Sequence, residues 1–287
     1  MCYRMLGLAA DADEVVQETF VRALERPPAD TSRPLGPWLN RVAMNLARDR
    51  LRARRRRRYV GPWLPSPVPD ALLDAAPSPE ARYGARESAS FAFLSALEAL
   101  TPTQRAVVLL RDVLDADVAE TAETLGSTAG AVKVAHHRAR AALAAYDARR
   151  MREPPADEVM LRFQRLLMAI GAGDVAAVRA ELAPDALTLN DADGRYHAAR
   201  QPVRGAEKVA RFLVNLQRMG QAGSRFGLAL LNGAPALIAR NDDPGPGAAP
   251  CWAMLACPDA EGRIGALYTV LVDEKLSLVR PILDDPR

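Results

Sequence analysis

The chain has 287 residues, of which 49% are hydrophobic and only 5% aromatic, and its formal net charge is +3. This length allows two or three small domains, and no apolar run is long enough for a membrane span or a signal peptide. The cysteines at positions 2, 251 and 257 are too few and too scattered for a disulfide framework or a zinc site. We therefore expect a cytoplasmic protein with buried reduced thiols, no metal and no cofactor.

The first segment is predicted to form a helix that ends at Pro27-Pro28. Asp11, Asp13 and Glu14 suit the positive end of the helix dipole at its start. We expect four apolar residues to form its buried face: Val16, Phe20, Ala23 and Leu24.

A basic helix is predicted between Trp38 and Arg58, where nine arginines stand against one acidic residue, Asp49. Five polar residues follow helical spacing and share one face: Arg41, Asn45, Arg48, Arg52 and Arg55. The opposite face is apolar: Leu39, Val42, Ala43, Leu46, Ala47 and Leu51. A helix with one apolar face and one cationic face is typical of proteins that lie along nucleic acid.

Residues 59–80 are predicted to be a linker, because six prolines within it oppose regular helix. It contains the sequence Trp63-Leu64-Pro65-Ser66-Pro67. We expect this Trp-Leu pair to dock on another part of the chain, since large apolar groups are seldom left in water without use. The alternative is a loosely exposed aromatic side chain.

A helix-turn-helix is predicted over residues 118–143, with Gly126-Ser127 as the turn and Thr128 as the cap of the second helix. Val132, Ala139 and Leu143 are expected to face inward. The remaining face of the second helix is basic and carries Lys133, His136, His137, Arg138 and Arg140. Such a face favours binding in the DNA major groove, and a solvated basic surface is the alternative.

Beyond Pro154-Pro155 the pattern changes to a mixture of helices and strands. Helices are predicted over residues 159–170, 174–182 and 205–219, and strands over 186–190, 226–231, 236–240, 251–257 and 264–272. Asn232-Gly233 is a strong hairpin turn. This order indicates an α+β domain in which a curved sheet wraps on helices.

Three stretches, in this order and with this linker, resemble an extracytoplasmic-function (ECF) sigma factor of the sigma-70 family. Residues 10–24 look like the polymerase-clamp helix, 38–58 like the minus-ten helix, and 100–143 like the minus-thirty-five helix-turn-helix. The resemblance implies a multidomain protein with two all-α sigma modules. It also implies binding to core RNA polymerase and promoter DNA, and no covalent chemistry.

The resemblance assigns roles residue by residue. Polymerase contact is expected from Asp13, Glu14, Gln17, Glu18 and Phe20. The polar face of residues 41–55 is expected at the minus-ten element, with Asn45 offering both a donor and an acceptor to an exposed base edge. The minus-thirty-five element is assigned to Thr128, Lys133, His136, His137, Arg138 and Arg140. Val134 and Ala135 stand where relatives often have Ser and Arg, which predicts weaker direct readout.

The remaining residues resemble the ECF subgroup with a C-terminal, cone-shaped SnoaL-like domain of the nuclear transport factor 2-like fold. The resemblance rests on the Trp63–Pro67 motif, on "PVRGAEKVARFL" (202–213), on the loop Asp191-Ala192-Asp193-Gly194 and on the late motif Val272–Leu276. It implies a regulatory domain that acts in place of a separate anti-sigma factor. The residues expected to regulate through interdomain contact are Trp63, Leu64, Pro65, Asp191, Asp193, Gly194, Asp273, Lys275 and Leu276.

We expect four parts: a region 2-like domain (1–58), the linker (59–86), a region 4-like domain (87–152) and the SnoaL-like domain (153–287). Relatives carry more helix before the point that matches Cys2, so Met1 is expected to fall inside the first element. Two alternative functions stay open. One is a ligand-sensing DNA-binding regulator that does not act through polymerase. The other is an isomerase- or cyclase-type enzyme using Asp191, Asp193, Tyr196, His197 or Tyr268, although enzymatic activity is not expected.

Overall fold

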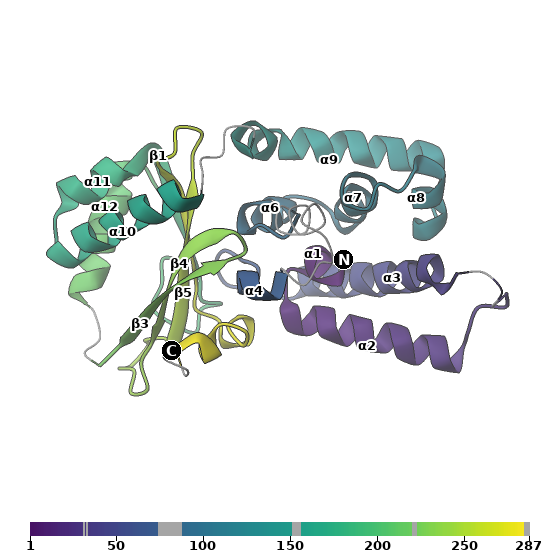
Figure 1. The fold of residues 1–287 in the computed structure, drawn as a ribbon, viewed down its shortest axis with the longest axis horizontal. Helices are drawn as coiled ribbons and strands as arrows, with labels where there is room; N and C mark the ends of the chain where they lie inside the picture. Colours follow the sequence, from purple (N-terminus) through teal and green to yellow (C-terminus); the bar gives the residue numbers. More distant parts are fainter. Residues whose placement is uncertain (31, 33, 74–87, 151–155, 220–222, 284–287) are drawn as a thin grey trace. The chain divides into compact units, whose positions relative to one another are not determined.

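The computed structural model describes residues 1–30, 32, 34–73, 88–150, 156–219 and 223–283, and contacts divide the chain into two compact units (Figure 1). Unit 1 contains residues 1–58 and 93–145, and unit 2 contains residues 59–92 and 146–287. Unit 1 therefore contains the predicted region 2-like domain (1–58) and residues 93–145 of the predicted region 4-like domain (87–152). Residues 59–92, which we call the linker from here on, fall in unit 2 together with residues 146–287.

The described part of unit 1 is helical. Its first three helices are α1 (Cys2–Leu6), α2 (Ala9–Glu25) and α3 (Leu35–Arg56), and helix α6 (Phe91–Leu97) crosses the boundary between the units. Helix α7 (Pro102–Val108) continues into a π-helical turn (Leu109–Val113), and α8 (Val118–Leu125) and α9 (Ala129–Arg150) follow. Buried residues of α3 and α7 include Met44, Leu51 and Val107.

The predicted buried face of α2 is wrong. The residues that are buried are Ala12, Val15 and Thr19, whereas three of the four predicted ones are exposed: Val16, Phe20 and Leu24. Thr19 can be buried because its hydroxyl donates to the Val15 carbonyl at 2.7 Å, which satisfies the polar group inside the helix. A small polar side chain whose hydrogen bond is made within the helix is thus buried where hydrophobicity alone predicts a larger apolar residue.

The helix-turn-helix forms as the sequence predicts. Asp117 caps α8 in a capping box with Glu120, and Gly126 ends α8 in the left-handed conformation at φ 58°. The Thr128 hydroxyl accepts from the Ala131 amide at 3.2 Å at the start of α9. The three residues predicted to face inward on α9 are buried: Val132, Ala139 and Leu143.

The described part of unit 2 contains one six-stranded sheet in the order β2-β1-β6-β5-β4-β3. Its strands are β1 (Leu182–Asp191), β2 (Val203–Arg204), β3 (Arg225–Leu231), β4 (Ala234–Arg240), β5 (Cys251–Pro258) and β6 (Ile264–Val270). Strands β1 and β6 are parallel, and the other neighbours are antiparallel. The predicted α+β class and hairpin turn at Asn232-Gly233 are confirmed, whereas the two-residue strand β2 was not predicted.

Each face of this sheet has its own apolar core. On one face pack α10 (Ala156–Ala172), α11 (Val175–Glu181) and α12 (Ala206–Arg218), with Phe163 and Val209 buried among sheet residues (Figure 1). On the other face, Leu64 of the linker and Phe91 are buried against Ile238, Leu255 and other sheet residues. The linker is therefore part of the core of unit 2.

The linker is not wholly extended. A one-turn helix, α4 (Asp70–Leu73), follows Pro69, although the prolines led us to expect no regular helix before residue 80. The prolines end at position 69 and resume only at 77, so this turn contains none of them. The rest of that expectation concerns residues 74–80, which lie outside the described part of the chain.

Candidate nucleic-acid interface and linker clamp

The predicted minus-ten face of α3 is polar and half-exposed, and three of its residues contact the helix-turn-helix half of unit 1. Arg48 donates to the Leu125 carbonyl at 3.2 Å, and Arg41 lies 3.9 Å from the Glu123 carboxylate. Arg55 donates to the Leu100 carbonyl and, at 3.2 Å, to that of Glu98. In unit 1 this face is therefore partly covered.

Two residues of the same face have contacts within α3. Arg52 pairs with Asp49 at 2.9 Å, and the Asn45 side-chain oxygen accepts from Arg48 at 3.2 Å. Burial lowers the pKa of the Arg48 guanidinium, and the charge of Arg52 lowers it further. The Nε of Arg48 is buried without a hydrogen-bond partner among the described residues, which carries a desolvation cost.

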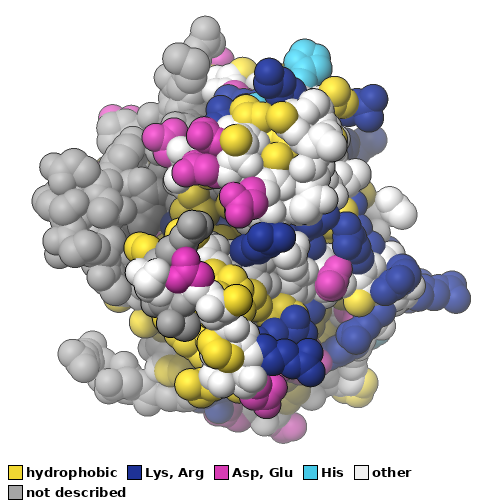
Figure 2. Space-filling model, turned by 90° about the vertical axis from the view of Figure 1, so that its right-hand side faces the viewer, with side chains coloured by type: hydrophobic (Ala, Val, Ile, Leu, Met, Phe, Trp, Pro, Cys, Tyr) yellow, Lys and Arg dark blue, Asp and Glu magenta, His cyan; other side chains and the backbone are white. Residues whose placement is uncertain are grey.

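The predicted minus-thirty-five residues of α9 divide into two groups. Lys133, His137 and Arg138 are exposed. His136 contacts Asp112 at 2.7 Å, and Arg140, which is also exposed, lies 3.5 Å from the same carboxylate. Figure 2 shows Lys and Arg side chains gathered along one side of the face that it draws, with a histidine beside them.

The predicted polymerase-contact residues lie on α2, where Asp13, Gln17 and Phe20 are exposed. Glu14 pairs with Arg50 at 2.5 Å, and Glu18 pairs with Arg22 at 2.6 Å. Beside them the helix presents an exposed apolar surface formed by Val16, Phe20, Val21 and Leu24, of which the sequence analysis assigned Val16, Phe20 and Leu24 to the core. Its signal in the sequence is the four-residue spacing of positions 16, 20 and 24.

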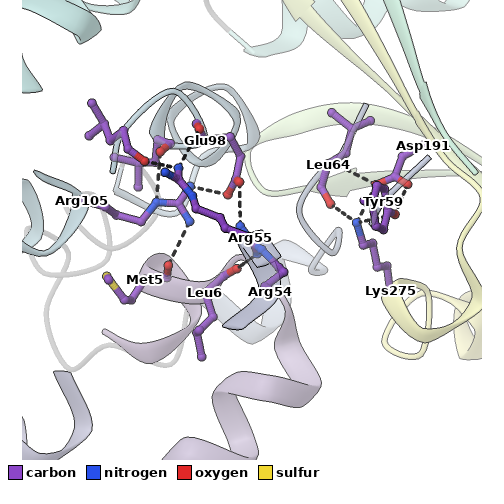
Figure 3. A network of polar contacts seen from close by, with 12 residues as sticks. Met5, Leu6, Arg54, Arg55, Tyr59, Leu64, Glu98, Arg105, Asp191 and Lys275 are labelled. Carbon is purple, nitrogen blue, oxygen red and sulfur yellow. Dashed lines mark hydrogen bonds and ion pairs between the residues drawn. The ribbon is translucent and has the colours of Figure 1, made fainter. Parts of the chain in front are cut away.

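A polar network joins the two halves of unit 1 (Figure 3). Glu98 accepts from Arg54 at 2.7 Å and also from Arg105. Arg105 is only 1% exposed and donates to the carbonyls of Leu97 at 3.1 Å and Met5 at 2.9 Å. We call Arg54, Glu98 and Arg105 the unit 1 network. The sequence analysis did not predict this network. The feature that could have indicated it is Arg105, a charged residue directly before the apolar run at positions 106–110.

A second network clamps the linker onto the C-terminal domain (Figure 3). Lys275 and Asp191 form an ion pair at 2.6 Å, and their side chains are 4% and 0% exposed. Asp191 also accepts from the Leu64 amide at 2.6 Å and from the Tyr59 hydroxyl, while Lys275 donates to the Leu64 carbonyl at 2.7 Å. The Lys275 ammonium lies 3.9 Å from the centroid of the Trp63 ring. We call Tyr59, Trp63, Leu64, Asp191 and Lys275 the linker clamp.

The other residues predicted to regulate lie around the clamp. Asp193 accepts from the Val60 amide at 3.1 Å, and a Cβ at Gly194 would lie only 3.1 Å from Val60, so a larger residue would crowd the linker. Leu276 is buried in the apolar core that also contains Leu64, and Pro65 is buried too. Asp273 accepts from Tyr196 at 2.6 Å and from Arg280 at 2.6 Å.

Four of the five side chains considered for acid–base chemistry have structural partners: Asp191, Asp193, Tyr196 and Tyr268. Asp191 belongs to the clamp, and Tyr268 packs against Phe91 with ring centroids 5.4 Å apart. Hydrogen bonding to Asp273 and partial burial raise the pKa of Tyr196 to about 12, with burial the larger cause. Within the described residues no group of three His, Cys, Asp or Glu side chains could hold a metal ion. No helix in the described part of the chain is long and apolar enough to cross a bilayer.

Comparison with known proteins gives the same two modules. Residues 1–57 match the family model Sigma-70 region 2, and residues 90–143 match Sigma-70, region 4. ECF RNA polymerase sigma factor SigJ of Mycobacterium tuberculosis is 39% identical over 240 residues, which cover 81% of this chain and 74% of SigJ. ECF RNA polymerase sigma factor SigG of the same organism is 36% identical over 197 residues, which cover 61% of this chain and 53% of SigG.

The likeness extends to the C-terminal domain. The crystal structure of M. tuberculosis extracytoplasmic function sigma factor SigJ superposes with a TM-score of 0.75, covering 97% of this chain and 94% of that chain at 30% identity. Both sigma modules and the six-stranded α+β domain are included in this coverage. The chain therefore belongs to the ECF sigma factors of the sigma-70 family and carries a C-terminal SnoaL-like domain.

Proposed function

We propose that the C-terminal domain of this sigma factor tunes transcription initiation by holding the linker between regions 2 and 4. The observation that carries the proposal is the linker clamp, in which a buried lysine and a buried aspartate bind the linker backbone at Leu64. Because a buried ion pair is costly unless its remaining bonds are satisfied, the linker completes the site rather than lying on it. The C-terminal domain can thus control the position of the linker residues that it binds.

The sigma factor directs core RNA polymerase to promoter DNA, and we assign the contacts as follows. The polar face of α3 holds phosphates near the minus-ten element, and Asn45 reads an exposed base edge. Lys133, His137 and Arg138 of α9 approach the minus-thirty-five element, and their exposure supports this role. If five to eight phosphates are neutralised, log affinity falls with log salt at a slope of about −5 to −7.

The covered face of α3 supports a closed form of the polymerase-free protein. Minus-ten and minus-thirty-five elements lie about 85 Å apart along straight duplex at about 3.4 Å per base pair. In unit 1, α3 contacts α8, and α9 follows α8 after a short turn, so α3 and α9 lie about 20 Å apart at ordinary helix-packing distances. Regions 2 and 4 therefore have to separate before both elements can be bound.

The polymerase is proposed to bind the exposed side of α2. Apolar side chains at Val16, Phe20 and Leu24 adjoin the acidic residues Asp13 and Glu14, a combination that suits an interface with an apolar centre and a charged rim. A DNA-binding regulator that does not act through polymerase has no use for this surface. A pull-down with core polymerase separates the two functions.

Three further expectations stay predictions. Enzymatic activity of the C-terminal domain is not expected, because fold alone carries no function and the candidate acid–base groups Asp191 and Tyr268 hold the linker and Phe91. No separate anti-sigma factor is expected, since the fused domain already acts on the linker. The site of action is expected to be the cytoplasm, where polymerase and promoters meet.

Trp63→Ala tests the proposed tuning, because Trp63 contacts the clamp lysine and lies in neither sigma module. The wild-type protein added to core polymerase is expected to give promoter-specific transcripts, and the variant is expected to change their yield without unfolding either unit. Trp252→Ala is the matched control, a half-buried tryptophan of the helix-covered core away from the linker. Wild-type yield from Trp63→Ala with Lys275 intact would contradict the proposal.

A further inference from the structure

Asn232, in the turn between β3 and β4, binds the linker at two places that lie far apart in the sequence. Its side-chain oxygen accepts from the Val68 amide at 2.7 Å, and its side-chain nitrogen donates to the Ala89 carbonyl at 2.7 Å. Its own amide donates to the Val68 carbonyl at 2.9 Å, and its own carbonyl accepts from the Phe91 amide at 3.1 Å. Four backbone groups of the linker are thus bound by one residue, which is only 1% exposed.

The turn itself does not require an asparagine. Asn232 has φ 51° and Gly233 has φ 75°, so a glycine at position 232 would satisfy this hairpin equally well. Asparagine adds one acceptor and two donors on a short side chain, and these are the groups that reach Val68 and Ala89. Leaving them buried and unpaired would be costly, so the bonds to the linker explain the residue.

These bonds hold residues 68 and 89 close together, and we call this closed point of the linker the neck. One side-chain amide reaches both Val68 and Ala89, which places the two bonded groups within about 8 Å of each other at ordinary hydrogen-bond lengths. Residues 69–88 lie between the two points in the sequence. The hairpin turn also binds Asp70, whose carboxylate accepts from the Gly233 amide at 2.8 Å.

The neck shortens the connection between regions 2 and 4. Residues 59–92 could span at most about 110 Å if fully extended, at about 3.3 Å per residue. With residues 69–88 removed by the neck, the remaining residues and the neck together span at most about 55 Å on the same scale. The neck thus reduces the maximal span of the linker by about half. This reduction is large compared with the roughly 85 Å that separates the two promoter elements.

We propose that Asn232 is a positioning residue that sets the effective length of the linker, and through it the spacing of promoter elements that the sigma factor accepts. Each added base pair moves the minus-thirty-five element about 3.4 Å away and rotates it around the helix axis. A shortened linker limits how far region 4 can move with the minus-thirty-five element. An unbound linker allows that movement. The inference rests on the proposed control of the linker by the C-terminal domain.

The test uses reconstituted holoenzyme on promoters whose spacer is changed in steps from four base pairs shorter to four longer. Asn232→Gly removes both side-chain bonds, keeps the left-handed turn and leaves Asp191 and Lys275 in place. Transcription from the longest spacers, relative to the optimal one, is expected to rise about tenfold over wild type. Asn232→Asp keeps only the acceptor for Val68 and is expected to give a smaller rise.

Asn241→Ala is the matched control, because Asn241 is also a buried asparagine of unit 2, directly after β4, and its side chain bonds Asp243 and Ser224. It is expected to keep the wild-type spacer profile. An unchanged profile in both Asn232 variants, or an equal change at every spacer, overturns the inference. Failure of the proposed tuning is recognised separately, because Trp63→Ala would then transcribe like wild type at the optimal spacer.

Discussion

The unit 1 network and the linker clamp each contain a carboxylate that binds basic groups, Arg54 and Arg105 in the first and Lys275 in the second. They differ in how far water can reach the carboxylate. Glu98 and Arg54 are 21% and 18% exposed, whereas Asp191 and Lys275 are 0% and 4% exposed. The clamp lies against an apolar core that contains Leu64, while on α3 the buried Nε of Arg48 has no hydrogen-bond partner within the described part of the chain. Water can therefore replace the bonds of Glu98 more cheaply than those of Asp191.

This difference matches what each contact has to do. In the proposed mechanism regions 2 and 4 separate on a promoter, so their contact has to be breakable. The linker has to stay on the C-terminal domain if that domain is to control it. A network that water can partly reach suits the first requirement. A fully buried ion pair suits the second, because breaking a buried pair leaves an uncompensated charge.

Lys275→Met is expected to produce the largest effect. It leaves the Asp191 carboxylate buried without its cation, which should lower the free energy of unfolding of unit 2 by about 3 to 5 kcal/mol. Urea unfolding of the full chain measures this loss. Lys208→Met, at an exposed lysine of the same unit, is the control and should change little. A loss below about 1 kcal/mol at Lys275, the value of an exposed ion pair, would contradict the greater strength assigned to the buried clamp.

Glu98→Gln is expected to lower the stability less than Lys275→Met does and to change the separation of regions 2 and 4 more. It removes the charge that Arg54 and Arg105 share, which should cost about 1 to 3 kcal/mol and raise the fraction of protein in which regions 2 and 4 are apart. Spin labels at Asn40→Cys and Ala142→Cys, both exposed and both in unit 1, report that separation. The native cysteines are buried.

Glu181→Gln is the matched control for Glu98→Gln. Glu181 is 15% exposed and pairs with Arg162 and Arg165, but it lies in unit 2. It should leave the label distances at their wild-type values. Identical distance distributions for wild type and Glu98→Gln would mean that Glu98 does not hold unit 1 closed.

The smallest expected effect is a pH dependence at Tyr59. Burial raises the pKa of its hydroxyl above the usual range, and the charge of Asp191 and its hydrogen bond raise it further. The neutral phenol is thus favoured in the folded state, so its contribution is complete below about pH 10 and declines as the pH rises above that value. The stability advantage of wild type over Tyr59→Phe should therefore shrink between pH 9 and 11. A constant difference across that range would exclude titration of Tyr59.

Local patterns predicted much of the fold. Gly126 and Thr128 mark the helix-turn-helix through their own conformational and capping preferences, and Asn232-Gly233 marks the hairpin for the same reason. Such signals depend on a few neighbouring residues. They therefore survive without knowledge of the tertiary structure.

Signals that depend on distant partners were missed or misassigned. Phe20 and Leu24 were assigned to the core, because hydrophobicity does not distinguish a buried face from an exposed binding surface. Arg105 is itself buried and bonds the Met5 carbonyl and Glu98, and only the packed helices bring these partners together. Asn232 was recognised as a turn residue, but its side chain binds residues 68 and 89, far from it in the sequence.

Amide hydrogen exchange of the linker in the full-length, polymerase-free protein tests the central claim most directly. The amides of Leu64, Val68 and Phe91 donate to Asp191 or Asn232 rather than to neighbours in a helix or strand. They should exchange slowly, at rates close to those of the β-sheet amides, and Lys275→Met should speed exchange at Leu64. Exchange at the rates of an unstructured peptide in the wild-type protein would contradict a linker held by the C-terminal domain.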